Sequence, residues 1–295
     1  MTFSEGGGFE GGRVETSRGG RGAAVGGGVG LLGIAVFLIA QFTGVDLSGV
    51  VGGAQGGGAT NEEVGTIGEC TVEEANTTRE CRLSATIQAL DAYWAQAVPA
   101  AGAEFVAPGV RAFEDSVVTG CGQASASTGP FYCPPDQKIY LDLGFYDLLQ
   151  SQFGSSGGPL AEIYVTAHEY GHHIQTITGV MDRADRQGTG STSDSVRVEL
   201  QADCYAGVYV GNASRTEDPD RPGTTFMQAP TDEELAQALS AAEAVGDDHI
   251  QEQSGGGVNP HTWTHGSSEQ RQRWFTTGYN EGDMAACDTF AATDL

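Results

Sequence analysis

The chain has 295 residues, with 14 Lys and Arg against 39 Asp and Glu, so its formal net charge at pH 7 is −25. A protein that follows nucleic-acid phosphates needs clustered positive charge, and this balance therefore excludes a nucleic-acid partner. Hydrophobic residues make up 39% of the chain, which is enough for a core. Of the 45 glycines, 20 lie in the first 60 residues, which indicates an ordered domain attached to a different N-terminal region.

The N-terminal region has the composition of a membrane address. Residues 1–22 are Gly-rich and polar without periodicity, and we expect a disordered cytoplasmic tail there. Residues 23–45 contain no charged residue and are long enough to cross a bilayer, which takes about 20 apolar residues. Arginines precede this stretch, so the positive-inside rule keeps the N-terminus cytoplasmic. The sequence thus predicts a single-pass signal-anchor helix in the cell membrane. A cleaved signal peptide and a buried core helix are the alternatives.

Beyond the anchor we expect a Gly-rich tether over residues 46–66 and one extracytoplasmic domain over residues 67–295. All six cysteines lie in that domain: Cys70, Cys81, Cys121, Cys133, Cys204 and Cys287. An even number in an exported domain indicates disulfides. Proximity in sequence favours Cys70–Cys81 and Cys121–Cys133, which leaves Cys204–Cys287. Buried free thiols remain possible, and a zinc knuckle is weakly supported because no C-x-x-C spacing occurs.

Helical signals dominate the domain. Thr71 to Glu74 has the form of a capping box, and apolar residues then recur at helical spacing, which predicts a long helix ending before Pro99. Further helices are expected over residues 145–153, 159–178, 193–210, 231–245 and 268–279, and strands within 105–118 and over 138–143. The strand at 138–143 is either an ordinary sheet strand or an edge strand that pairs with an extended peptide.

One predicted helix carries a metal-binding motif. Residues 166–175 read Thr-Ala-His-Glu-Tyr-Gly-His-His-Ile-Gln and contain H-E-x-x-H. His168 and His172 are four residues apart, so both imidazoles lie on one helix face and can reach one metal ion. Glu169 is offset from them and suits a general base acting on a zinc-activated water.

The third ligand decides the class of the site. A metzincin needs a histidine at position 178, which is Thr178, so that class is excluded. On the next predicted helix, Glu199 and Asp203 form E-x-x-x-D. Glu199 would complete a His₂Glu site for one zinc ion, and Asp203 would accept a hydrogen bond from a ligand histidine. The alternative is that the histidines only pack on a structural helix.

Two further histidines are candidates for lesser roles. His265 precedes a predicted helix, and it would stabilise an oxyanion as a catalytic residue or serve in capping and packing. His173 lies about 100° around the helix from His172 and is expected to point away from the metal.

Four segments together resemble the bacterial neutral zinc metallopeptidase family: residues 129–134 with 136–142, 168–175, 199–204 and 265–271. The resemblance implies an α+β, zincin-like domain, mostly helical with a small sheet and preceded by one transmembrane helix. The chain also resembles the wider group of gluzincins, which implies Glu169 as general base and Glu199 as third ligand. The implied function is a membrane-tethered zinc metalloendopeptidase that cleaves peptide or protein substrates outside the cytoplasmic membrane. A non-catalytic, zinc-stabilised binding or scaffolding module of the envelope is the alternative.

Overall fold

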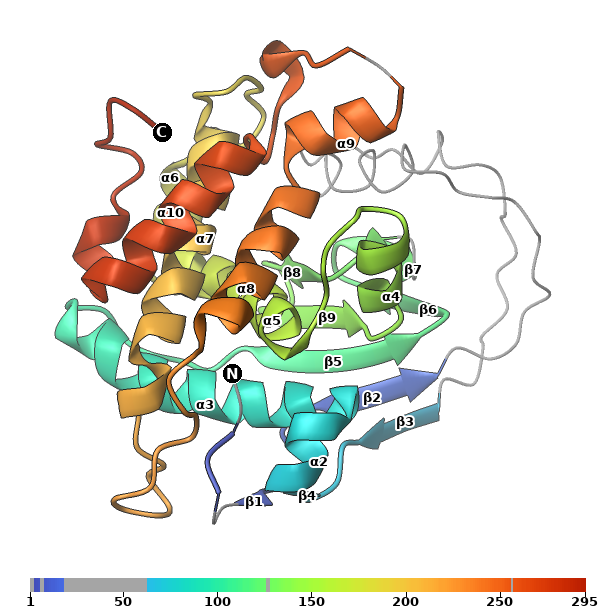
Figure 1. Ribbon diagram of the computed structural model, residues 1–295, viewed down its shortest axis with the longest axis vertical. Helices are drawn as coiled ribbons and strands as arrows, with labels where there is room; N and C mark the ends of the chain where they lie inside the picture. Colours follow the sequence, from blue (N-terminus) through green and yellow to red (C-terminus); the bar gives the residue numbers. More distant parts are fainter. Residues whose placement is uncertain (1–2, 6–7, 19–62, 126–127, 256) are drawn as a thin grey trace.

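The computed structural model describes residues 3–5, 8–18, 63–125, 128–255 and 257–295. These residues form an α+β fold in which a small sheet lies beside a larger group of helices (Figure 1). In the view of Figure 1, α6, α7 and α10 gather on the left and the strands β2, β5 and β9 lie to their right. The expected α+β class, mostly helical with a small sheet, agrees with this arrangement.

The main sheet has five strands in the order β3-β2-β5-β9-β8. Its strands are β2 (Glu15–Arg18), β3 (Glu63–Thr66), β5 (Gly109–Glu114), β8 (Phe131–Cys133) and β9 (Lys138–Asp142). The three central strands run parallel, and the two outer pairs are antiparallel. Strand β9 therefore lies inside the sheet, whose two edge strands are β3 and the three-residue β8. The expected strand at 138–143 is present, but its reading as an edge strand is wrong.

Two small antiparallel pairs complete the strands in the described part of the chain. They are β1 (Gly8–Phe9) with β4 (Cys70–Thr71), and β6 (Ser116–Thr119) with β7 (Gly122–Ser125). The second pair is a hairpin that encloses Gly120 and Cys121.

The α-helices of the described residues are α2 (Val72–Thr77), α3 (Arg79–Ala100), α4 (Phe145–Ser151), α5 (Pro159–Ile177), α6 (Val180–Arg183), α7 (Asp194–Asn212), α8 (Asp232–Ala244), α9 (Asp247–Gln253) and α10 (Ser268–Glu281). The single helix expected from residue 71 is two helices, because Thr78 takes an extended conformation between them. The first begins at the expected capping box of Thr71 and Glu74, and the second continues past Pro99 for one residue.

Helix α5 lies at the centre of the helical layer and packs against α3, α7, α8 and the strands β8 and β9. Every residue of α5 from Leu160 to Gln175 is buried. At its closest approach to α7, a Cβ built on Gly171 would lie 3.2 Å from the Cα of Ala202. Glycine in the motif therefore allows α5 and α7 to approach closely, and this contact brings their functional side chains together.

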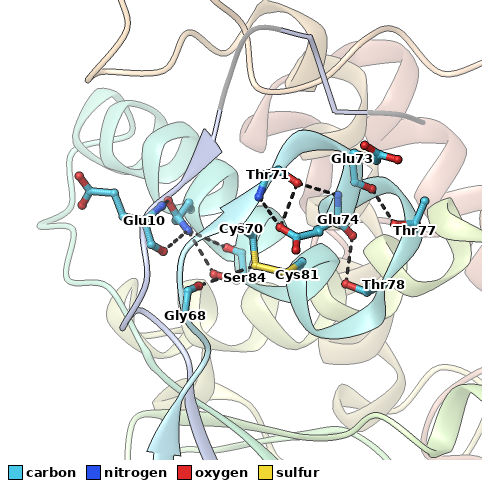
Figure 2. Close-up of a disulfide and its surroundings, with 11 residues drawn as sticks. Glu10, Gly68, Cys70, Thr71, Glu73, Glu74, Thr77, Thr78, Cys81 and Ser84 are labelled. Atoms are coloured by element: carbon cyan, nitrogen blue, oxygen red, sulfur yellow. Dashed lines mark hydrogen bonds between the residues drawn. A yellow bond between two sulfur atoms is a disulfide. The ribbon is translucent and has the colours of Figure 1, made fainter.

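The six cysteines form three disulfides, Cys70–Cys81, Cys121–Cys133 and Cys204–Cys287. This confirms the pairing favoured by sequence proximity. Figure 2 shows the first of them joining β4 to α3, beside the capping box of Thr71 and Glu74. Glu10 of the N-terminal segment lies next to this disulfide in the same view.

The expectation of a disordered tail over residues 1–22 is wrong for the residues that the structure describes. Phe3, Phe9 and Val14 are buried in the main core, and β2 lies between β3 and β5. The charged side chains of β2 are paired as well, since Glu15 accepts from Arg111 at 2.7 Å. Three apolar residues spaced among glycines give no periodic signal in the sequence. Their burial depends on contacts with residues distant in sequence, which only the folded structure shows.

The transmembrane helix in the expected fold class is also corrected. Within the described ranges, the structure contains no helix with the length and apolar character that a membrane crossing requires. The predicted anchor at 23–45 and the tether up to residue 62 lie outside those ranges, and Glu63–Thr66 of the tether is strand β3. Because β2 pairs antiparallel with β3, the N-terminal segment belongs to the same folded unit as the rest of the described chain.

Candidate metal centre

Local sequence fixes the two ends of the helix that carries the motif. Pro159 occupies the first turn of α5, where its missing N–H costs no helical hydrogen bond. Gly179 follows the last turn with φ 73°, a left-handed conformation that favours glycine. Between these ends, His168 and His172 contact Glu199 of the neighbouring helix α7, and Glu169 contacts the backbone of Tyr132 on strand β8.

The structure brings His168, His172 and Glu199 together, and their ligand atoms all lie within 4.8 Å of one another. Nε2 of His168 is 3.2 Å from Oε2 of Glu199, and Nε2 of His172 is 3.4 Å from Oε1. Two ligands that bind zinc tetrahedrally at 2.0–2.1 Å are about 3.3 Å apart. Oε1 of Glu199 is buried and has no hydrogen-bond partner in the described chain. The donor set, its spacing and this unsatisfied oxygen all fit a zinc ion.

The hydrogen bond made by Nδ1 of each histidine determines that Nε2 is the nitrogen available to a metal ion. Nδ1 of His168 donates to Oδ1 of Asp203 at 2.7 Å, and Nδ1 of His172 donates to Oε1 of Gln175 at 2.8 Å. The amide of Gln175 is itself oriented, because its Nε2 donates to the Val198 carbonyl at 2.7 Å. Because Nδ1 is engaged on both rings, Nε2 is the nitrogen that each ring can offer to a metal ion, and both Nε2 atoms lie toward Glu199.

Asp203 is the centre of a buried polar network. It accepts from Tyr164 Oη at 2.6 Å and forms an ion pair with Arg271, whose Nε lies 2.9 Å from its second oxygen. Asp203 is 0% exposed and Arg271 is 3% exposed, so the two charges neutralise each other inside the protein. The sequence predicted Asp203 beside a ligand histidine, and the structure places it there. The roles of Tyr164, Gln175 and Arg271 were not predicted, although Arg271 ends one of the segments that carry the family resemblance.

The buried charges set the ionisation of the centre. Burial raises the pKa of Glu169 to about 7, and the negative charge of Glu199 adds to this rise. Burial also favours a neutral Glu199, but the surrounding imidazoles outweigh it and hold the pKa of that carboxyl well below its usual range. Burial lowers the pKa of His172 to about 4. For His168 the carboxylates of Asp203 and Glu199 overcome burial and raise the pKa to about 10.

His265 lies in the same cavity as the candidate ligands. It is 6% exposed, and its Nδ1 is 3.3 Å from Oδ1 of Asp247 and 2.9 Å from the Thr264 hydroxyl. The second oxygen of Asp247 accepts the backbone N–H groups of Thr264, His265 and Gly266 at 2.7–3.0 Å. One carboxylate thus fixes both the loop and the imidazole. The structure thus places His265 in the cavity of the candidate ligands.

The cavity that contains the centre is a cleft with a largely apolar wall. Its apolar lining includes Phe131, Phe145, Phe153, Val165, Met181, Val245 and Ile250. Edge strand β8 borders it through Phe131 and Tyr132, and the backbone N–H of Tyr132 donates to the Glu169 carboxylate. The cleft therefore offers an apolar surface next to a buried carboxylate and the candidate metal ligands.

His173 points away from the ligands, as its place on the helix predicted. Its Nε2–H donates to the Val106 carbonyl at 2.6 Å, so its Nδ1 accepts from Tyr132 Oη at 3.1 Å. The imidazole thereby ties β8 to the helix that carries Glu169. Tyr170, the residue between Glu169 and Gly171, is buried and donates to Asp91 of α3 at 2.7 Å.

Comparison with known proteins gives relatives that span most of the chain. An uncharacterized protein of Mycobacterium tuberculosis (strain H37Rv), Rv2575, is 49% identical over 230 residues, which cover 78% of this chain and 77% of the relative. The uncharacterized protein YpfJ of Escherichia coli K12 is 36% identical over 266 residues, which cover 88% of this chain and 86% of the relative. No solved structure matches the chain.

The sequence profile of one protein family matches residues 4–290. This range includes the metal-binding motif, Glu199, Asp203 and His265, and it also includes the N-terminal strands. The family is described as "Putative neutral zinc metallopeptidase", in agreement with the resemblance found in the sequence. By that match, which covers nearly the whole chain, the protein belongs to this family.

Proposed function

We propose that the protein is a zinc-dependent metalloendopeptidase that holds one zinc ion through His168, His172 and Glu199. The observation that carries this proposal is the convergence of these three side chains at zinc-ligand spacing, with the buried carboxylate of Glu169 beside them. Zinc bound there would polarise a peptide carbonyl and lower the pKa of a water molecule.

In this proposal Glu169 is the general base and then the general acid. A pKa near 7 suits a group that must accept a proton and return it at neutral pH. The carboxylate takes a proton from the attacking water and passes it to the leaving amine. The N–H of Tyr132 donates to Glu169 and helps to hold it in position.

His265 would stabilise the oxyanion that develops on the peptide carbonyl. It lines the cleft and is held by Asp247, so it needs little reorganisation when charge develops. The apolar lining around Phe153, Val165 and Ile250 favours a substrate that places a bulky apolar side chain next to the cleaved bond.

Replacement of Glu169 by Gln tests the function. We expect the variant to bind zinc with a stoichiometry of about one and to lose peptide hydrolysis, because the amide cannot accept the proton. Zinc content measured by mass spectrometry and cleavage of a mixed peptide library give the two readouts. Glu73→Gln, an exposed residue on α2, is the matched control and should behave as wild type.

Two results would contradict the proposal. If Glu169→Gln cleaved peptides as fast as wild type, the assigned mechanism would be wrong. If zinc-loaded wild type cleaved none of the library, the non-catalytic zinc-stabilised module would be the better reading.

We propose further that the domain works outside the cytoplasm. The support is the set of three disulfides, since such bonds persist in oxidising compartments and are rare in the cytosol. Whole cells are quenched with acid, and the protein is then denatured at neutral pH with a thiol reagent. Its cysteines should react with the reagent only after reduction. Labelling of the cysteines without reduction would refute this location.

A further inference from the structure

The cleft contains a second, cationic feature beyond the metal centre. Arg186 lines the cavity together with Met181, and both residues belong to the segment that follows the C-terminal end of α5. Val165 lies before His168 on α5, and the other apolar lining residues come from other elements, among them Phe131 of β8 and Ile250 of α9. Arg186 is therefore a cationic group in a cleft whose lining is otherwise largely apolar.

The backbone of Arg186 is fixed close to the metal centre. The hydroxyl of Ser195 donates to the carbonyl of Arg186 at 3.0 Å and to that of Gly188 at 2.7 Å. Ser195 is fully buried and lies on α7 one helical turn before Glu199, a rise of about 6 Å. The Arg186 carbonyl is therefore anchored about one helical turn from the third candidate ligand.

The guanidinium of Arg186 has no ion pair or hydrogen bond within the described residues, and the residue is only partly exposed. The other guanidinium that lines the cleft, that of Arg271, is buried and paired with Asp203. Asp182 and Asp185 precede Arg186 closely in sequence and are exposed, yet neither is its partner in the described chain. In a chain with 39 acidic residues, a cleft arginine without a partner is available to a ligand.

We infer that Arg186 determines substrate specificity by binding a carboxylate of the peptide that occupies the cleft. This inference rests on the proposed peptidase function and deepens it. A guanidinium binds a carboxylate through two parallel N–H bonds, so it selects charge and geometry together. The substrate class is a peptide that carries a bulky apolar residue for the apolar wall and a carboxylate for Arg186. That carboxylate belongs to an acidic side chain or to the peptide's C-terminus.

The test uses the full-length, zinc-loaded protein and peptides with a blocked N-terminus that all contain the same apolar residue. A Glu, Gln or Lys is moved along the positions on either side of it, and each peptide is made with a free C-terminus and with a C-terminal amide. We expect wild type to cleave the best Glu peptide, or the free-acid form, with a kcat/KM about tenfold above its uncharged counterpart. Arg186→Gln should bring this ratio close to one, and Arg186→Glu should reverse it in favour of Lys.

Arg183→Gln is the matched control, because Arg183 is an exposed arginine of α6 that does not line the cleft. It should retain the wild-type ratio. A side-chain preference identifies an acidic residue as the ligand, and a preference confined to free termini identifies the C-terminal carboxylate. An absence of charge preference in wild type, or a preference that survives in Arg186→Gln, would overturn the inference.

A failure of the proposed peptidase function can be distinguished from a failure of the inference about Arg186. If no peptide is cleaved, binding of the same peptides to zinc-loaded Glu169→Gln protein is measured by fluorescence anisotropy. Binding that favours Glu peptides and depends on Arg186 would keep the inference while the peptidase proposal fails. Binding without such a preference would overturn the inference as well.

Discussion

Asp203→Asn is the substitution whose effect follows most directly from the geometry. The carboxylate is fully buried, and its Oδ1 accepts three hydrogen bonds, from Tyr164 Oη, His168 Nδ1 and Nη2 of Arg271. Its Oδ2 forms an ion pair with Nε of Arg271 at 2.9 Å. Asparagine has one oxygen in place of two, so its amide N–H₂ would face at least one of these donors. The change also leaves the charge of Arg271 buried without a counterion.

The expected magnitude has two parts. Loss of one partner from a buried ion pair costs about 3–5 kcal/mol of folding stability. Loss of the carboxylate that orients a ligand histidine weakens metal binding by about 10–100-fold. We therefore expect a lower free energy of unfolding in the metal-free protein and, separately, a higher dissociation constant for zinc. The first effect would be measured by urea denaturation in the presence of a chelator, and the second by competition with a zinc indicator.

The pH dependence gives an independent check of the same carboxylate. Burial favours its protonated form, but Arg271 and His168 outweigh burial and keep the pKa of Asp203 below its usual range. A depressed pKa contributes stability above the unfolded value, about 3.9, and that stability is lost as the pH falls toward the folded value. The stability gap between wild type and Asp203→Asn should therefore be widest between about pH 5 and pH 6.5 and should narrow below about pH 4. It should also narrow above about pH 6.5, because Asp203 raises the pKa of His168 to about 10 and that contribution is lost as the histidine deprotonates.

Asp147→Asn is the control for this experiment. Asp147 also pairs with an arginine, Arg79, at 2.8 Å, but its side chain is 70% exposed. Pairs of that kind contribute about 0–1 kcal/mol, so the control should change little. If Asp203→Asn matched this control in both stability and zinc affinity, the buried network would not support the metal centre as argued.

Three further substitutions test how the fold supports the site. Arg13→Ala should lower the free energy of unfolding by about 1–3 kcal/mol in urea denaturation, because Arg13 pairs with a half-buried aspartate of α3 at 2.5 Å. Tyr132→Phe should lower it by about 1–2 kcal/mol, since it leaves Nδ1 of His173 without its donor. Replacing both Cys204 and Cys287 by Ala should cost about 4–5 kcal/mol, because their disulfide closes a loop of 83 residues. In each case, an unfolding midpoint equal to that of wild type would contradict the assigned contact.

Much of the helical layer could be predicted because its signals are local. Pro159 and Gly179 delimit α5, and Ser193 caps α7 as the pattern indicated. The spacing of His168 and His172 places them on one face of a helix regardless of the surroundings. The E-x-x-x-D pattern places Glu199 and Asp203 on one face of the next helix, so they are the expected partners of the two histidines. The structure brings the four side chains together.

The sheet could not be predicted in the same way, because its pairing depends on residues distant in sequence. Strand β2 reads Glu-Thr-Ser-Arg, without apolar alternation, and its partners are β5 and β3. Strand β8 has three residues, which is too short for a periodic signal, so β9 was open to interpretation as an edge strand. Arg271 was also hidden, since only the packing of α10 against α7 brings its guanidinium to Asp203.

One carboxylate, that of Asp91, links the N-terminal segment to the helix that carries the candidate ligands. Asp91 of α3 receives the Arg13 guanidinium on both oxygens and the Tyr170 hydroxyl at 2.7 Å. Tyr170 lies between Glu169 and His172, so α5 is held from this side by α3 and from the other by the contact of Gly171 with α7. Because Asp91 would still accept from Tyr170 without Arg13, loss of the N-terminal contact should reduce stability more than zinc affinity. The segment first interpreted as a tail thus contributes to the layer that positions the candidate ligands.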